Sequence, residues 1–516
     1  MPMSGIVRGR RVLSFAPGIH GDAVWWQGGR LAAVGRAEDL ARRAPRGTPV
    51  YDLPGALITP GFVDGHTHFA MWALNRWRVT LVDAASARDV VRRVAGATPV
   101  QGWVVGQGWD ANAWHEAPHR AMLDAVQAAP VYLDSLDVHA AWVNSAALAA
   151  ASIGRDTPDP FGGRIVRDAV GEPTGLLLER AVELMLPHLP EPPDDLLDQA
   201  LREGQAEAHR LGLTGIHNVE GEGPLAAFER LSEADELRLR VLFHPPVASL
   251  GGLVARGIRS GDGGAWLRFG GVKMFLDGSL GSRTAWMLEP YASSRDRGMP
   301  ITSEAEAADA MRTAAAAGIA STVHAIGDAA VRRALDVMSS LPRSAVPHRI
   351  EHFQCVHPDD LDRAAAAGIT ASMQPAHLLT DIPLIERHWG ARGRGAYAFE
   401  SLRRRGTALV FGSDAPVASL DPREGLYAAL ERQADAGGAP GGWRPDERLA
   451  FEDAVRGYTA GAAHAAGVRA GALAPEESAD LVAWSFDPAA ERGVGEAVRT
   501  GEAVLTVVGG EVVMRR

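Results

Sequence analysis

The two ends of the chain share one hydrophobic pattern. Short apolar segments separated by Gly and Pro occur near the start, as VLSFAPG, AVWWQGGRLAAVG and VYDLPG, and near the end, as ADLVAWSF and AVLTVVGG. Such segments are typical of an antiparallel sheet. Neither end is long enough to bury a good core by itself. We therefore predict that residues 1–59 and 466–516 combine into one small β-sandwich, with a large domain inserted between them.

The middle of the chain follows a different pattern, in which a helical segment ends in glycine and continues directly into a strand. The pattern occurs at residues 207–219, 314–328, 364–377 and 401–414. Glycine suits such helix ends because it tolerates the left-handed conformation that often follows the last helical turn. Alternating helices and strands predict an α/β fold with a parallel sheet.

Eight segments of this middle region are candidate strands of the sheet. They are LITPGFVDGHTH, TGIHNV, RLRVLFHPP, FGGVKMFLDG, IASTVHAIG, HRIEHFQC, ITASMQPAH and ALVFGSD. Eight strand–helix units predict a (β/α)8 TIM barrel over residues 60–465, with its active site at the carboxyl ends of the strands. An open doubly wound sheet is the alternative, but the Gly-rich phosphate loop of that fold does not follow LITPGFVD.

Two segments are too long to be simple connections. About residues 75–190 separate the first two strands and contain GWVVGQGWD, PVYLDSLDVH and GGRIV, which predicts an insertion with its own strands over the barrel mouth. Residues 377–402 precede the last strand, and a segment of this length suggests a lid over the active site.

Composition and charge narrow the class of protein. The 516 residues are 46% hydrophobic and 22% charged, as expected for a globular chain and not for a disordered one. The 52 basic and 63 acidic residues give a net charge of −11, so no basic surface for nucleic acid is expected. Cys355 is the single cysteine, which excludes an intramolecular disulfide and fits a reducing compartment.

The N-terminal segment predicts the location of the protein. It carries arginines where a signal peptide would have its apolar core, and no run approaches the roughly 20 apolar residues of a membrane span. We therefore expect a cytoplasmic protein with no membrane association and a small-molecule substrate; a homodimer stays open.

The first candidate chemistry is a pair of histidines at the end of the first strand. His66 and His68 are two residues apart, so their side chains point to the same face of the strand and can bind one metal ion. One such pair is weak evidence because it also occurs by chance. Four more residues of metal-ligand type lie near the carboxyl ends of other predicted strands, namely Lys273, His324, His352 and Asp414. Because barrel enzymes place their reactive groups there, the set predicts a metal site.

Lys273 has a further peculiarity. It is the only lysine, so the other 51 of the 52 basic residues are arginine. A genome that avoids lysine codons would explain this as chance. Alternatively, position 273 needs chemistry that a guanidinium cannot supply.

The motifs GFVDGHTH, VKMFLDGS, VHAIGD, EHF and FGSDAP stand in this order along the chain. In them the sequence resembles the metal-dependent amidohydrolase superfamily. GQGWD, HAAWVNSAAL and KMFLDGSLGSRTA are similar to features of its branch of N-substituted formamide deformylases, amidohydrolase family 3. The resemblance spans nearly the whole chain, because YTAGAAHAAGV and ESADLVAWSFDP resemble the closing segment of the family.

The resemblance implies a ligand set. His66, His68 and Asp414 would bind one ion, and His324 and His352 a second. Zinc is the leading choice of metal. Some members of the family bind a single ion, so the number is one or two. Lys273 would bridge the ions as an N-carboxylated lysine, since a buried lysine can lose its proton and react with carbon dioxide whereas arginine cannot. An ordinary Lys–Asp ion pair is the alternative.

The resemblance also implies an activity. We expect a hydrolase that cleaves the C–N bond of an amide or formamide, with metal-activated water and with Asp414 as general base and then general acid. A cyclic-amide hydrolase, a deaminase and a metal-dependent isomerase or decarboxylase are alternatives on the same ligands. A non-catalytic binding protein is a further alternative, which the complete ligand set disfavours.

Substrate-binding candidates come from loops that we expect near the barrel mouth. They are Trp109, Asp110, His139, Asp277 and Arg283. Arg283 could hold a carboxylate or carbonyl by two hydrogen bonds, and Trp109 could form an apolar wall. Loop-stabilising salt bridges and simple packing are the alternatives for these residues.

Overall fold

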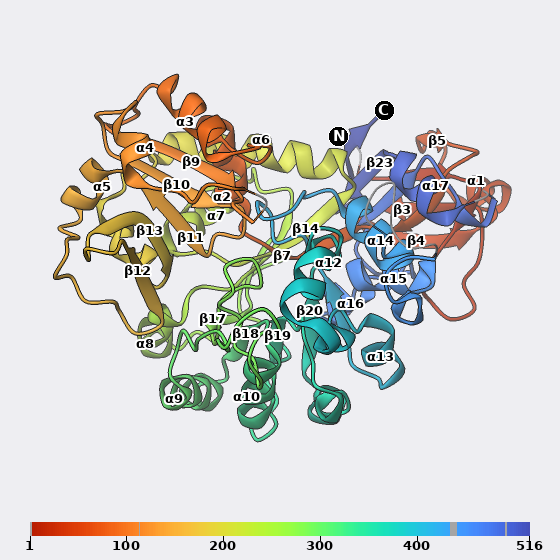
Figure 1. Cartoon of the computed structure of the whole chain (residues 1–516). Coiled ribbons are helices and arrows are strands. Elements are labelled where there is room, and N and C mark those ends of the chain that lie inside the picture. The colour runs from red at the N-terminus through yellow and green to blue at the C-terminus, as the bar shows by residue number, and fades with distance from the viewer. Residues whose placement is uncertain (1–2, 113, 434–440, 491–492) are drawn as a thin grey trace.

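A computed structural model describes residues 3–112, 114–433, 441–490 and 493–516. Figure 1 shows two parallel sheets in the middle of the molecule, a further sheet (orange) on one side, and strands from both ends of the chain (red and blue) on the other side. Segments from the two ends of the chain, far apart in sequence, therefore lie together.

The two central sheets are entirely parallel. The first has the order β16 (Leu267–Phe269), β15 (Arg240–Phe243), β14 (Leu213–Asn218) and β7 (Phe62–Thr67). The second has the order β17 (Gly271–Phe275), β18 (Ala320–Ala325), β19 (Arg349–His352), β20 (Thr370–Met373) and β21 (Leu409–Phe411). Only Gly270 separates β16 from β17. The backbone N–H of Asp414, just beyond β21, donates to the carbonyl of His66 in β7 at 2.7 Å.

Each predicted strand segment contains a strand, with one correction. The first segment divides at Gly61 into β6 (Leu57–Pro60) and β7. Strand β6 pairs antiparallel with β22 (Leu481–Trp484) from the other end of the chain. Only glycine fits at 61, because a Cβ atom there would overlap the side chain of Thr214.

The predicted helix ends are confirmed by backbone conformation. Gly212, Gly318, Gly368 and Gly406, which follow the helical parts of the four repeated segments, all have positive φ angles between 68° and 84°. The helices between and around the parallel strands are α6 (Asp194–Arg210), α7 (Glu222–Glu233), α8 (Leu250–Ala255), α9 (Glu304–Ala316), α10 (Asp328–Met338), α11 (Arg363–Ala367), α12 (His377–His388), α13 (Phe399–Arg404), α14 (Pro422–Glu431), α15 (Phe451–Tyr458) and α16 (Ala460–Ala465).

Residues between β7 and β14 form a six-stranded sheet, here called the inserted sheet. Its order is β12 (Gly163–Arg167), β13 (Pro173–Glu179), β11 (Ala140–Val143), β10 (Val131–Ser135), β9 (Val104–Trp109) and β8 (Val79–Thr80). The helices of this region are α2 (Phe69–Leu74), α3 (Ala87–Ala95), α4 (Arg120–Asp124) and α5 (Ser145–Ala150). The inserted sheet has apolar clusters of its own, one of them built around Trp109, Leu133 and Trp142.

The ends of the chain form two further sheets. One contains β4 (Arg30–Gly35), β3 (Ala23–Gln27), β1 (Gly5–Arg8) and β5 (Val50–Asp52), and the other β2 (Arg11–Val12), β6, β22, β23 (Ala503–Val508) and β24 (Glu511–Arg515). Helices α1 (Ala37–Arg43) and α17 (Val494–Thr500) accompany them. Val7 and Trp26 pack in one cluster with Leu481 and Leu505, so the two ends share a core. Among the described helices, none is both long enough and apolar enough to cross a membrane.

Candidate metal centre

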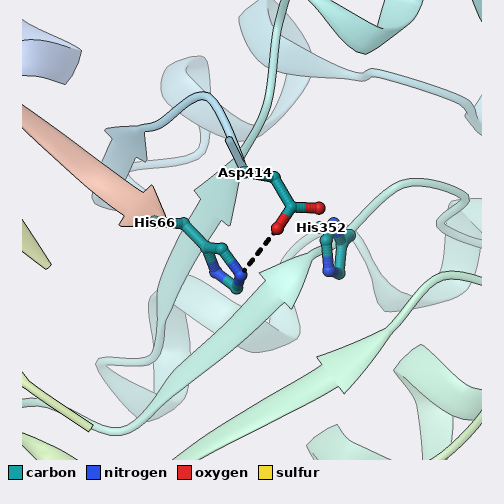
Figure 2. Close-up of side chains that lie close together, drawn as sticks. All are labelled: His66, His352 and Asp414. Carbon is teal, nitrogen blue, oxygen red and sulfur yellow. Dashed lines mark ion pairs between the residues drawn. The ribbon is translucent and has the colours of Figure 1, made fainter. Parts of the chain in front are cut away.

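The six predicted ligands all lie at or near the carboxyl ends of the parallel strands. His66 is in β7 and His68 directly follows it; Lys273, His324 and His352 are in β17, β18 and β19; Asp414 follows β21. Figure 2 shows the side chains of His66, His352 and Asp414 converging. One potential ligand atom from each of these three residues lies within 4.8 Å of the others.

The carboxylate of Asp414 contacts both histidines of the first strand. Its Oδ1 atom is 3.2 Å from Nε2 of His66 and 3.3 Å from Nε2 of His68. Burial alone would raise the pKa of Asp414, but the charge of His66 and the close contacts of the His66 and His68 imidazoles lower it well below its usual value. Asp414 is therefore ionised at neutral pH, the form in which a carboxylate binds metal or accepts a proton.

His66 is oriented by a buried acid that the sequence analysis missed. Its Nδ1 atom is 2.5 Å from Oε2 of Glu351, and Glu351 in turn forms an ion pair with Arg349. All three side chains are completely buried. Because Nδ1 is engaged, Nε2 faces Asp414, and it has no hydrogen-bond partner among the described residues. A ligating histidine whose other nitrogen is held by a carboxylate is a common arrangement at metal sites.

His324 and His352 form the other side of the centre. Their ring centroids are 4.5 Å apart. His324 donates from Nε2 to the carbonyl of Gly278 at 3.2 Å, and its buried Nδ1 has no partner among the described residues. Burial lowers the pKa of both imidazoles well below the usual value, which keeps them in the neutral form that binds metal. The unpartnered buried nitrogens of His66 and His324 therefore fit a metal ion as their missing partner.

Two residues of the centre have left-handed backbones. His352 has a φ of 68° and Asp414 a φ of 58°. Such conformations cost a non-glycine residue of order 1–3 kcal/mol and persist where the surroundings fix them, typically at functional sites. The backbone contact of Asp414 with His66 is one such restraint.

Lys273 is buried without a counter-ion in contact. Its side chain forms no salt bridge with any described residue, so the Lys–Asp ion pair that the sequence left open is not formed. Its Nζ atom lies 4.4 Å from the ring centroid of Phe275. Burial lowers the pKa of Lys273 to about 8, although Glu351 and Asp414 oppose this shift. A larger share of the amine is therefore neutral than in an exposed lysine.

A cleft of about 1380 Å³ opens onto this centre. The strand ends contribute His352 and Asp414 to its lining, and the inserted sheet and its loops contribute Trp109, Asp110 and His139. Helix α12, in the segment expected to act as a lid, contributes Leu379, Thr380, Asp381 and Leu384. The cleft therefore lies between the parallel sheets and the inserted sheet.

The five predicted substrate-binding residues differ in their access to this cleft. Trp109, Asp110, His139 and Arg283 line it. Asp277 has no exposed surface, and its carboxylate accepts hydrogen bonds from the backbone N–H groups of Trp286, Ile326 and Gly327. Asp277 thus holds the loops beneath the cleft, and burial raises its pKa to about 7 despite these three donors.

His139 is held by a second buried acid that the sequence analysis missed. Its Nδ1 atom is 2.7 Å from Oε2 of Glu179, and its ring centroid is 5.2 Å from that of His324. Burial would lower the pKa of His139, but the carboxylates of Glu179 and Asp137 raise it to about 9. Glu179 belongs to the segment GLLLER, whose apolar neighbours were the one sequence signal that this acid is buried.

Known proteins resemble this chain in sequence and in fold. A model of the Amidohydrolase family matches residues 49–514. The protein YtcJ of Bacillus subtilis (strain 168) is 31% identical over 486 residues, which cover 90% of this chain and 89% of YtcJ. An N-substituted formamide deformylase of Arthrobacter pascens is 28% identical over 504 residues, which cover 90% of each chain. The crystal structure of a metal-dependent hydrolase from Pyrococcus horikoshii OT3 has a TM-score of 0.78 and 26% identity, covering 94% of this chain and 98% of that one.

Proposed function

The chain belongs to the amidohydrolase family, and we propose that it is a metal-dependent hydrolase that cleaves the carbon–nitrogen bond of an amide. N-substituted formamides are the leading substrate class, because a relative that aligns with 90% of this chain is an N-substituted formamide deformylase. The observation that carries the proposal is the convergence of His66, His352 and Asp414. Nε2 of His66 and Nδ1 of His324 are buried at this centre without a hydrogen-bond partner among the described residues.

The proposed ligands divide into two groups. His66, His68 and Asp414 would hold one ion, and His324 and His352 a second. Zinc is the first choice for this mixture of histidine and carboxylate ligands. One or two such ions would activate a water molecule and the substrate carbonyl as Lewis acids. Glu351 keeps Nε2 of His66 directed toward this position.

Lys273 would complete the ligand set as a carbamate. Its neutral amine would attack carbon dioxide, form the N–C bond and release a proton, leaving one negative charge shared by two oxygens at the end of a long side chain. The lowered pKa of about 8 and the absence of a salt bridge to any described residue support this reaction. Arginine cannot replace it, because its guanidinium does not lose a proton in proteins.

Asp414 carries the proton transfers in the proposed mechanism. Ionised at neutral pH, its carboxylate accepts a proton from the attacking water and then passes this proton to the leaving nitrogen. Its contacts with His66 and His68 hold the carboxylate in place for both steps.

The cleft suggests that the group on the amide nitrogen is large. Its volume of about 1380 Å³ far exceeds what a formyl group needs. Trp109 and Trp114 supply aromatic surface, and their ring centroids are 6.1 Å apart. Asp110 and Arg283 supply polar groups at the same cleft. We propose that these residues bind the substituent, and that Asp277 acts indirectly by holding the cleft floor.

We also propose how the sheets combine. The nearly continuous β16 and β17, and the hydrogen bond between Asp414 and His66, support one closed (β/α)8 barrel over residues 60–465, with an insertion at about 75–190. The shared core of the chain ends supports one sandwich of residues 1–59 and 466–516. A small-molecule substrate, a cytoplasmic location and a possible homodimer remain parts of the proposal.

The proposed function is tested by assaying zinc-loaded protein against N-substituted formamides, other N-acyl amides and cyclic imides. We expect hydrolysis of at least one amide class, with one oxygen atom from labelled water in the product. Asp414→Asn should abolish the activity, whereas Asp235→Asn, at an exposed acid that does not line the cleft, should leave it unchanged. Loaded protein that turns over these compounds without incorporating solvent oxygen, or that hydrolyses none of them, would overturn the proposal.

A further inference from the structure

We propose that Asp381 determines which amides the enzyme accepts, by binding an ammonium group on the substituent of the amide nitrogen. Gln354 and Tyr397 are its positioning residues. The identity of the bound molecule as an amide rests on the proposed function. The contact itself requires only a ligand of the cleft that carries an ammonium group.

The position of Asp381 carries the first part of this inference. The residue lies in α12 and lines the same cleft as His352 and Asp414. The helix begins beside the metal centre, because the ring centroid of His377 is 6.5 Å from that of His352. Asp381 is one helical turn further along, a distance of about 5.4 Å. It therefore faces the part of the cleft in which the substituent of a bound amide would lie.

The orientation of the carboxylate carries the second part. The hydroxyl of Tyr397 donates to Oδ2 of Asp381 at 2.5 Å, and the amide nitrogen of Gln354 donates to the same oxygen at 2.7 Å. Oδ1 has no hydrogen bond to any described residue, and it is not fully buried. Because a carboxylate oxygen only accepts hydrogen bonds, Oδ1 offers an open acceptor to a ligand of the cleft.

The two donors are themselves fixed in place. Gln354 and Tyr397 are buried, and the backbone N–H of Tyr397 donates to the backbone carbonyl of Gln354 at 2.9 Å. Tyr397 has a left-handed φ of 50°, and its own carbonyl accepts a hydrogen bond from Arg432 at 3.0 Å. These contacts keep Oδ2 of Asp381 engaged, so the free oxygen is always Oδ1.

The charge of Asp381 is not compensated by the protein. Within the described part of the chain, no arginine, lysine or histidine lies within ion-pair distance of its carboxylate. Burial raises the pKa of Asp381, and the charge of His377 and the hydrogen bonds from Tyr397 and Gln354 oppose this rise only in part. A charge in such a place is costly unless it is paired. An ammonium group, with its positive charge and three N–H donors, would supply the missing partner of Oδ1.

Four basic residues also line the cleft and do not take this place. They are Arg76, Arg78, Arg164 and Arg283. Arg76 pairs with Glu203 instead, and Arg283 is exposed. The acceptor therefore stays available to a ligand.

A purely structural role is the alternative, in which Asp381 only attaches α12 to Gln354 and Tyr397. Asparagine separates the two roles, because its carbonyl oxygen can accept both hydrogen bonds while its NH2 group takes the place of Oδ1. Asp381→Asn thus keeps the attachment and turns the acceptor that faces the cleft into a donor, which disfavours an ammonium group.

The test compares two series of N-alkylformamides as substrates of zinc-loaded enzyme. In one series, short alkyl chains of increasing length end in an ammonium group, and in the other a methyl group replaces the ammonium group. At the chain length that reaches Asp381, we expect kcat/KM of the ammonium compound to exceed that of its methyl counterpart at least about tenfold. Asp381→Asn should lower this ratio about 10–100-fold.

The control is another acid of the same helix. Glu386→Gln removes an exposed carboxylate of α12 that does not line the cleft, so it should leave the ratio unchanged. If Asp381 served only to attach the helix, Asp381→Asn would leave the ratio unchanged at every chain length. That result would overturn the inference, as would an equal loss in Glu386→Gln.

A binding measurement keeps this inference separate from the proposed function. Alkylphosphonates resemble the tetrahedral state of a formamide under attack, and calorimetry measures their affinity for zinc-loaded protein without turnover. We expect a terminal ammonium group to strengthen binding at least about tenfold in the wild-type protein and not in Asp381→Asn. If no amide is hydrolysed but Asp381→Asn removes this gain, the substrate assignment fails and the ammonium site stands. If formamides are hydrolysed and the ammonium group gives no gain in either measurement, the ammonium site is overturned and the proposed function stands.

Discussion

The imidazole of His66 and the carboxylate of Glu351 lie 2.5 Å apart, and neither side chain has any exposed surface. This contact fixes which nitrogen of His66 is available, since Nδ1 is engaged and Nε2 faces Asp414. Strand β19 thus supplies two neighbouring residues with different contacts: Glu351 holds His66, a proposed ligand from β7, and His352 faces the centre directly.

Removing the charge of Glu351 should weaken metal binding although the residue is not itself a proposed ligand. Substitutions of such carboxylate partners typically lower metal affinity about 10–100-fold. We expect a loss of this size for Glu351→Gln, measured by competition with a chelator. Glu236→Gln, which removes a half-exposed acid that does not line the cleft, serves as the control. Unchanged affinity in Glu351→Gln would show that the contact does not orient the ligand.

The single lysine should be chemically modified in the loaded protein. Native mass spectrometry should detect about 44 Da of additional mass, the carbon dioxide adduct of a nucleophilic amine. Lys273→Arg keeps the positive charge but should lose both the adduct and the second metal ion. Arg→Lys changes elsewhere should not create a second adduct. Normal metal content and turnover in Lys273→Arg would instead favour codon usage as the reason for a lone lysine.

Metal removal should lower both activity and thermal stability. The buried nitrogens of His66 and His324 have no other partner among the described residues, so the ion satisfies groups that are costly to leave unpaired. At a zinc concentration of 100 times Kd, binding to the native state alone adds about 2.7 kcal/mol to the free energy of unfolding. Differential scanning calorimetry during zinc titration should therefore show a rising Tm. A His66→Asn, Asp414→Asn double variant should show a much smaller rise, and an equal rise would place the zinc elsewhere.

A carboxyl group in the inserted sheet should make stability depend on pH. Burial raises the pKa of Asp134 to about 6, although it accepts a hydrogen bond from Tyr132 at 2.6 Å. Between its unfolded pKa of 3.8 and about 6, the folded protein keeps a proton that the unfolded chain releases, so stability falls as pH rises through this window. Asp134→Asn stays neutral and should remove about 3 kcal/mol of that fall. Parallel unfolding profiles of the two proteins from pH 4 to pH 7 would contradict this expectation.

Short sequence patterns were sufficient to predict the parallel strands and the proposed metal ligands. Glycine is the residue favoured where a helix ends in the left-handed conformation, as at Gly368, so it marks the helix–strand junction. His66, His324 and Asp414 then follow from their place near strand ends, because parallel strands bring their carboxyl ends to one side.

The acids that orient the histidines could not be predicted in this way. Glu179 contacts a histidine 40 residues earlier in the chain, and that contact depends on how β13 pairs with β11. In the sequence, Glu351 is a charged residue within a predicted buried strand and has no visible partner. Its partner, His66, belongs to β7, which is far away along the chain. The break at Gly61 was missed for the same reason, because the partner of β6 comes from the far end of the chain. These features arise from long-range pairing, which periodicity does not encode.

The shared core of the chain ends has a consequence for synthesis on the ribosome. Trp26, which is completely buried, donates from its indole nitrogen to the carbonyl of Gly510 at 2.9 Å and packs in the same cluster as Leu505. The first strands therefore emerge long before the strands that cover them, and must wait with apolar surface exposed until residues 503–515 have been translated. Nascent chains of this protein should depend on chaperones through most of their elongation.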